Sequence, residues 1–125
     1  MKCMTLTVPA KKECILVMRM TAAGVCALHD LPVDVMEDLR TAIDESCELL
    51  LHQDYVAETL TLCCEAKKDG LYVTITAQER TCQQCDDAAD ADIAKLIIGT
   101  LVKEVTLQQD ESGVHGVVMA LPAKA

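Results

Sequence analysis

The sequence has no phenylalanine and no tryptophan, and two tyrosines are its only large aromatic residues. Platforms that bind RNA or single-stranded DNA stack bases on aromatic faces, so a platform of this kind is excluded. Positive charge is also scarce, because 20 acidic residues against 11 basic ones give a formal net charge of −9. Nucleic acid binding needs a basic surface, which is missing here. We expect no direct contact with nucleic acid, whereas an acidic surface is compatible with a basic protein partner.

Long hydrophobic runs are absent too. No stretch reaches the roughly 20 apolar residues of a membrane-spanning helix. The N-terminal stretch "MKCMTLTVPAKK" lacks the apolar core of a signal peptide. We therefore predict a cytoplasmic protein without membrane contact. Because that compartment keeps thiols reduced, the eight cysteines are expected to be free thiols and not a disulfide framework.

The residues that are present suffice for one folded domain. Hydrophobic residues make up 51% of the 125 residues, and their side chains are almost all aliphatic. No linker or internal repeat interrupts the chain. We predict a single domain over residues 1–125.

Hydrophobic spacing and turn residues predict the element order β-α-α-β-β-α-β-β. The first helix is expected to begin at Pro9, where a missing N–H costs nothing. The second is expected to begin near Asp34, which forms a capping-box pattern with Glu37. The expected strands cover residues 3–8, 57–66, 71–78, 104–109 and 116–122.

Two of the predicted helices show an apolar face at helical spacing, and we expect both faces to pack on the sheet. The face of the second helix consists of Val35, Leu39, Ala42, Ile43, Cys47 and Leu50. The face of the third helix consists of Ile93, Leu96, Ile97, Thr100 and Leu101.

The stretch "KKDG" predicts a hairpin turn in which Gly70 supplies a positive φ. If Ala66 pairs with Leu71, one face of the hairpin is apolar, while Cys63 and the threonines point to the other face. The buried pairs would then be Cys64 with Val73, Leu62 with Ile75 and Leu60 with Ala77. With helices on one face, the chain is expected to form a two-layer α+β sandwich around a mixed sheet.

Two stretches carry a family resemblance. "LTVPAKKECILVMRMTAAGV" and "VMEDLRTAIDESCELLLHQDY" are similar to the first strand and first two helices of a family of anti-sigma factors that are also serine-protein kinases. The second helix of that family runs close to E-D-I-K-x-A-V-x-E-A-C-x-N-A-x-x-H-A-Y. The family belongs to the histidine-kinase-like ATPase superfamily, so the resemblance implies the Bergerat fold, with ATP and magnesium as cofactors.

The resemblance also assigns roles to single residues. Glu45 falls on the acid that activates the attacking hydroxyl, and Arg19 falls on an arginine associated with nucleotide and partner contacts. Leu49 stands where the family has its magnesium-binding asparagine, and leucine has no oxygen to offer a metal ion. We therefore expect Glu45 to be a vestige of a catalytic site.

Two further nucleotide elements of the family are missing. Its adenine-binding Asp-x-Gly motif is replaced here by Ala77 or Gln78. Its glycine-rich lid is replaced by "CQQCDDAADADIAKL", whose aspartates would occupy the start of the third helix and repel a triphosphate. These aspartates are Asp86, Asp87, Asp90 and Asp92.

We therefore interpret the chain as an anti-sigma-factor-like regulatory protein. It would bind a sigma factor or an anti-sigma antagonist, with ATP binding weak or lost. The first alternative is an active serine kinase of the same family that phosphorylates an antagonist. The resemblance further implies a homodimer formed through the sheet.

A second alternative is a cysteine-based metal or redox sensor. Cys82 and Cys85 have the spacing of a metal-ligand pair, and Cys63 and Cys64 on a neighbouring strand are candidates for two more thiolates. The predicted register, however, points Cys63 and Cys64 to opposite faces, which opposes joint ligation.

Overall fold

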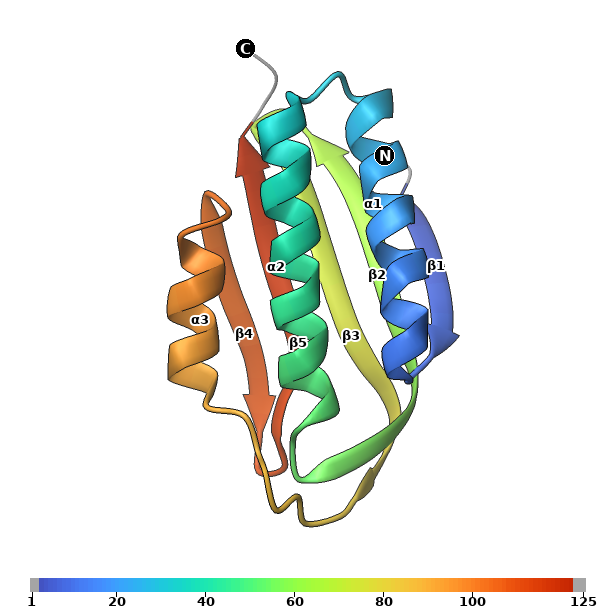
Figure 1. Cartoon of the computed structure of the whole chain (residues 1–125), viewed down its shortest axis with the longest axis vertical. Helices are drawn as coiled ribbons and strands as arrows, with labels where there is room; N and C mark the ends of the chain where they lie inside the picture. The colour runs from blue at the N-terminus through green and yellow to red at the C-terminus, as the bar shows by residue number, and fades with distance from the viewer. Residues whose placement is uncertain (1–2, 123–125) are drawn as a thin grey trace.

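A computed structural model describes residues 3–122, and the remaining residues of the expected 1–125 domain lie outside this range. The polypeptide forms five strands and three α-helices, and a short 3₁₀ turn precedes the first helix (Figure 1). In chain order the elements are β1 (Cys3–Pro9), η1 (Lys12–Cys14), α1 (Ile15–Leu28), α2 (Val33–Leu51), β2 (Tyr55–Lys67), β3 (Gly70–Cys82), α3 (Ala91–Gly99), β4 (Glu104–Asp110) and β5 (Gly113–Pro122).

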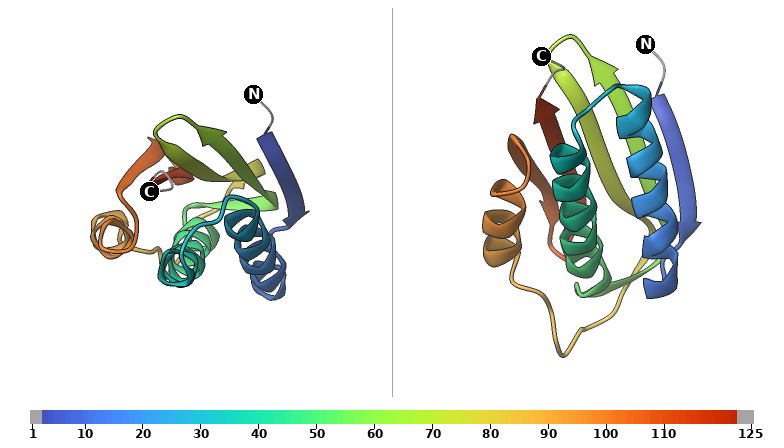
Figure 2. Two further views of the ribbon diagram at one scale, coloured as in Figure 1. Left: turned by 90° about the horizontal axis from the view of Figure 1, so that it is seen from above. Right: turned by 45° about the horizontal axis from the view of Figure 1, so that its top comes forward.

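The strands form one sheet in the order β1-β2-β3-β5-β4, and the three helices lie side by side over one of its faces (Figures 1 and 2). The predicted two-layer α+β sandwich and its element order are thus confirmed. The predicted mixed sheet is wrong, because all four strand pairings are antiparallel. For β1 and β2 the reason is the connection between them. Helices α1 and α2 run in opposite directions and return the chain to the end of the sheet where β1 finished, so β2 runs antiparallel to β1.

The hairpin of β2 and β3 has the predicted register. Ala66 pairs with Leu71 and Leu62 pairs with Ile75. Gly70 has φ 144°, so a residue without a Cβ suits the end of this turn. Buried and partly exposed residues alternate along both strands, as expected for a sheet with one covered face. The open face carries Thr61, Thr74 and Thr76.

The starts of the first two helices differ from the prediction. Pro9 ends β1 instead of opening a helix, and α1 begins only at Ile15. Helix α2 begins at Val33, directly after Pro32, so Asp34 lies within the first turn and no side chain caps the helix. A carboxylate in that position favours the helix dipole but does not form the predicted capping box.

The apolar face of α2 is confirmed, because all six predicted residues are buried or half-buried. The predicted face of α3 is wrong except at Leu101, which follows the helix and packs half-buried against the core. Ala94 and Ile98 point inward, whereas Leu96 is 72% exposed and Ile93 and Ile97 are also exposed. Helix α3 packs beside α2 and β4 at the edge of the helical layer, where a small residue such as alanine allows close approach.

The prediction that all cysteines are free thiols is also wrong. A disulfide joins Cys3 of β1 to Cys63 of β2, with 6.3 Å between their Cα atoms. The other six cysteines are free. The bond is explained by strand pairing, since the antiparallel ladder of β1 and β2 places the two side chains on the same open face. Within residues 3–122, no helix is both long and apolar enough to cross a membrane.

Candidate functional site

Glu45 and Leu49 lie one turn apart on α2, but their surroundings differ. Glu45 is half-buried, and within residues 3–122 its carboxylate has no hydrogen-bond or ion-pair partner. Leu49 is 1% exposed and belongs to the hydrophobic core, which also contains Ala94 and Ile98 of α3. The position at which the resemblance implies a magnesium ligand is therefore filled by an aliphatic side chain packed in the interior.

The start of α3 provides no free anion site. Asp90 is the N-cap of this helix, and its side chain accepts hydrogen bonds from the backbone N–H groups of Asp92 and Ile93. These amides are the groups that would otherwise bind a phosphate. The helix start is thus satisfied by the protein's own carboxylate, as the sequence predicts.

The segment that replaces the glycine-rich lid is attached to the end of α2. The N–H of Ala89 donates to the carbonyl of His52 at 2.8 Å, and the N–H of Gln83 donates to the carbonyl of Asp54 at 3.1 Å. The N–H of Cys85 donates to Oδ1 of Asp54 at 3.0 Å. Three hydrogen bonds therefore hold this segment against the domain.

The two residues of β3 that replace the adenine-binding aspartate, Ala77 and Gln78, carry no carboxylate. Ala77 is buried and pairs with Leu60, while the side chain of Gln78 accepts a hydrogen bond from Thr61 at 2.8 Å. Together with Leu49 and Asp90, these residues do not fit ATP and magnesium. No phosphoryl transfer step can be derived from their arrangement.

Arg19 projects from α1 toward α2. Its guanidinium lies 3.3 Å from a carboxylate oxygen of Asp44, and the Nε atom is buried without a hydrogen-bond partner. A groove of ≈ 420 Å³ lies beside this ion pair, between the two helices. The groove is lined by Lys12, Glu13, Ile15, Leu16, Arg19, Asp44 and Glu48.

Cys82 and Cys85 lie in the connection after β3. The thiol of Cys85 donates to the carboxylate of Asp87 at 3.1 Å, which raises the pKa of Cys85 and lowers that of Asp87. A raised pKa disfavours the thiolate that metal binding and redox attack require. Cys63 and Cys64 do not supply the two further thiolates of a metal site, because Cys63 is disulfide-bonded and Cys64 is buried. Across residues 3–122, no group of three or more ligand-type side chains could hold a metal ion.

Two buried polar residues were missed by the sequence reasoning. Gln53 donates from Nε2 to the carbonyl of Leu49 at 2.9 Å and accepts the N–H of Val114 at 2.9 Å. Tyr55 donates to the carbonyl of Val114 at 2.7 Å, and burial raises the pKa of Tyr55 to about 12. These residues join the end of α2 to β5. No sequence motif distinguishes them from surface residues of the same type.

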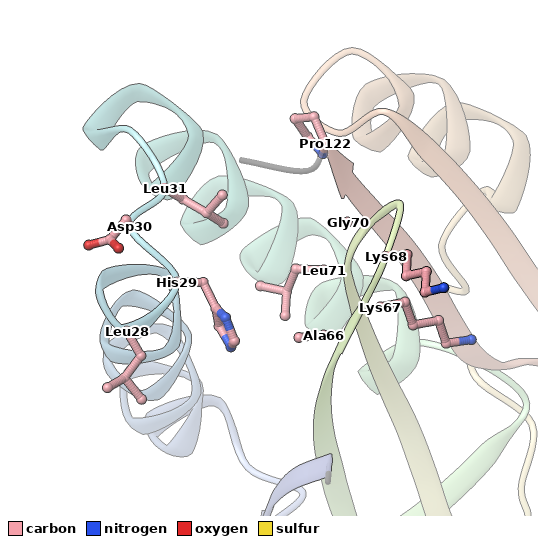
Figure 3. A pocket seen from close by; sticks show the side chains of 10 residues that line it. All are labelled: Leu28, His29, Asp30, Leu31, Ala66, Lys67, Lys68, Gly70, Leu71 and Pro122. Carbon is pink, nitrogen blue, oxygen red and sulfur yellow. The ribbon is translucent and has the colours of Figure 1, made fainter. Parts of the chain in front are cut away.

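A further cavity of ≈ 420 Å³ lies at the opposite end of the molecule, between the α1–α2 connection and the β2–β3 turn (Figure 3). The imidazole of His29 points into this space, whereas the side chains of Lys67 and Lys68 point away from it (Figure 3). The polar groups do not converge on one point, so this cavity does not present a ligand site.

Comparison with known proteins gives related sequences and a related structure. No family model matches the chain. A serine-protein kinase RsbW of Halalkalibacterium halodurans is 24% identical over 93% of this chain and 79% of its own length. An anti-sigma-F factor RsbW of Mycobacterium tuberculosis is 28% identical over 84% of this chain. The expected resemblance to anti-sigma factors and serine-protein kinases is confirmed.

The structural comparison supports the fold. The crystal structure of the RsbU and RsbW domains of Rv1364c from Mycobacterium tuberculosis matches 99% of this chain with a TM-score of 0.74, at 12% sequence identity. The chain spans 34% of that protein and 61% of the mycobacterial anti-sigma-F factor. The likeness of fold therefore extends over the whole domain, while both mycobacterial proteins contain parts without a counterpart here.

Proposed function

We propose that this chain is an anti-sigma-factor-like regulatory protein that binds a sigma factor or an anti-sigma antagonist and has lost ATP-dependent kinase activity. The observation that carries the proposal is the burial of Leu49 one turn after Glu45. The similarity to RsbW proteins supports the regulatory class, and the apolar core at the metal-binding position opposes catalysis. Glu45 is then a remnant without a nucleotide to act on.

The exposed face of α1 is the best candidate for partner binding. Leu16, Val17 and Met20 are exposed on this helix, with Met20 66% exposed. Arg19 lies at the edge of this face, where it pairs with Asp44 and lines the groove together with Leu16. Exposed apolar side chains beside an arginine have the composition of a protein-binding surface, in which Arg and Met are enriched. The regulatory role then implies a cytoplasmic location, shared with the partner.

A binding experiment tests this surface. The tagged chain is expressed together with each sigma factor of its own host, and complexes are separated by size-exclusion chromatography. We expect a complex with one of them that a Met20→Asp variant fails to form. Leu28→Asp, at an exposed position near the end of the same helix, is the matched control. Absence of any complex with a sigma factor or an antagonist would contradict the regulatory proposal.

Nucleotide titration tests the loss of kinase activity. Isothermal titration of the purified protein with ATP and magnesium is expected to give no heat of binding. Micromolar binding that disappears in a Glu45→Ala variant would overturn this part of the proposal.

The retained carboxylate of Glu45, half-buried and without a partner among residues 3–122, favours an active serine kinase as the second candidate. Transfer of phosphate from ATP to an antagonist protein encoded by the same host would support the active kinase. We also propose the homodimer that the resemblance implies. Light scattering of the purified protein, which measures the molar mass in solution, tests it.

A further inference from the structure

The disulfide between Cys3 and Cys63 lies outside the hydrophobic core. It is on the open face of the sheet, where Cys3 is exposed and Cys63 is half-buried. Neither residue belongs to the core cluster, whereas Val8 of the same strand does. The packing of β1 therefore does not depend on the sulfur atoms alone, because its backbone ladder with β2 and its inward side chains also hold it.

The two cysteines are diagonal neighbours. Cys3 is opposite Glu65, and Cys63 is opposite Thr5, so the pair is offset along the two strands. Diagonal side chains on one face of a twisted antiparallel pair remain within reach of each other. Both sulfur atoms thus lie in a position where they can join or separate without a change of register.

Four of the six free cysteines are less suited to thiol exchange. Burial raises the pKa of Cys47 to about 12 and that of Cys64 to about 11. Cys26 is buried with a raised pKa as well, and the thiol of Cys85 is held by Asp87. Exchange requires an accessible thiolate, which these four positions disfavour.

We propose that Cys3 and Cys63 form a reversible redox site that exchanges with small thiols and disulfides of the glutathione class and so fastens or releases the edge strand β1. In the oxidising direction, one cysteine thiolate attacks the small disulfide, forms a mixed disulfide and releases one thiol. The second cysteine then attacks the protein sulfur of the mixed disulfide and releases the second thiol. In sum the protein dithiol loses two protons and two electrons, and the small disulfide gains them as it becomes two thiols.

The site has a structural consequence because the two cysteines are 60 positions apart in sequence. The closed loop contains α1, α2 and the candidate surface around Arg19. Closing a long loop removes conformational freedom from the unfolded chain and so stabilises the folded state. Oxidation is therefore expected to stabilise the region that carries the proposed partner surface, although the redox chemistry itself does not depend on that function.

Mass spectrometry after trypsin cleavage tests the bond. The intact chain is incubated with oxidised or reduced glutathione, alkylated without reduction and digested. Cleavage at Lys and Arg releases residues 3–11 and 41–67, which a Cys3–Cys63 bond would keep together. We expect the linked pair, with fragmentation placing the bond at Cys63, in oxidised glutathione and separate peptides in reduced glutathione. A bond that never forms, that joins other cysteines or that resists reduced glutathione would overturn the proposal.

Thermal unfolding supplies a second readout. The oxidised protein is expected to melt on the order of 10 °C above the reduced protein, given typical disulfide effects in a domain of this size. A Cys3→Ser variant should lose this difference. Cys82→Ser is the matched control, since Cys82 is exposed and unpaired, and it should retain the difference. An equal difference in both variants would contradict the assignment.

Discussion

The side-chain oxygen of Gln53 accepts the backbone N–H of Val114 at 2.9 Å, which ties the end of α2 to the start of β5. The same side chain donates to the carbonyl of Leu49, so one buried amide satisfies backbone groups of two elements. Buried polar groups stabilise a fold only when their partners are present. Gln53 is therefore a structural residue at the base of the helix that carries Glu45.

Replacing Gln53 by alanine should destabilise the domain. The variant removes the buried acceptor of the Val114 N–H, at a cost of about 1–3 kcal/mol, while the carbonyl of Leu49 keeps its hydrogen bond from the N–H of His52. Urea denaturation measures the change. Gln84→Ala, in the exposed connection after β3, is the control and should change the free energy of unfolding by less than about 0.5 kcal/mol.

Two glycine-to-alanine variants should have opposite effects. A Cβ on Gly113 would collide with Oε1 of Gln53, and Gly113 has φ 116°, so Gly113→Ala should destabilise the protein. Gly24 lies in α1, and nothing is found within 4 Å of the position that an added Cβ would occupy. Gly24→Ala should therefore stabilise the protein by about 0.5–1 kcal/mol. Thermal unfolding compares them, and equal effects of the two variants would contradict this geometry.

Two alanine substitutions test which face of α3 is buried. Ile98 is fully buried, so Ile98→Ala should cost about 2–4 kcal/mol of unfolding free energy. Leu96→Ala should cost little, because the side chain already contacts solvent. If urea denaturation shows a larger loss of unfolding free energy for Leu96→Ala than for Ile98→Ala, the face predicted from the sequence is the buried one.

Introducing asparagine at Leu49 should not recover nucleotide binding. The polar group would enter the core and destabilise the fold by about 2–4 kcal/mol, while Asp90 would still occupy the start of α3. Calorimetry with ATP and magnesium should show no binding by Leu49→Asn. Leu96→Asn, at an exposed position, controls for the substitution itself.

Asp110 should make stability depend on pH in the acid range. Hydrogen bonds from Ser112 and Arg80 lower the pKa of this carboxyl to about 2. Its unfolded pKa is about 3.9, so the charged form binds its partners better in the folded state. The contribution is therefore present above about pH 4 and is lost as the pH falls toward 2.

Melting temperatures from about pH 2 to about pH 7 measure this contribution. The difference between the wild type and Asp110→Asn should be constant near neutral pH and shrink below about pH 4. Glu111→Gln, a neighbouring exposed residue, should not show this dependence. A difference that grows on acidification would contradict the assignment.

The parts of the fold that were predictable are those with a strong local signal. Alternation along residues 57–66 and 71–78, with Gly70 at the turn, determines the register of β2 and β3. The prediction of the buried face of α3 was wrong because this helix has two apolar stripes. Periodicity alone favours the stripe with Ile93, Leu96 and Ile97 over the one with Ala94 and Ile98. Packing of α3 against α2 and β4 buries the stripe with Ala94 and Ile98.

The candidate site was only partly predictable, for a similar reason. Replacement of a metal ligand by Leu49 is readable in the sequence, and so is the row of acids at the start of α3. The disulfide and the role of Gln53 depend on which strands are neighbours. That information is absent from local patterns, because Cys3 and Cys63, like Gln53 and Val114, are distant in sequence.

The Cys3–Cys63 bond also changes what a single peptide-bond cleavage does to this molecule. When the bond is closed, a cut anywhere between the two cysteines produces two pieces that stay covalently attached. A nick in the connection between α1 and α2 would then leave the mass of the folded particle unchanged apart from one added water. After reduction of the nicked molecule, only non-covalent contacts would join the N-terminal piece, with β1 and α1, to the rest of the domain.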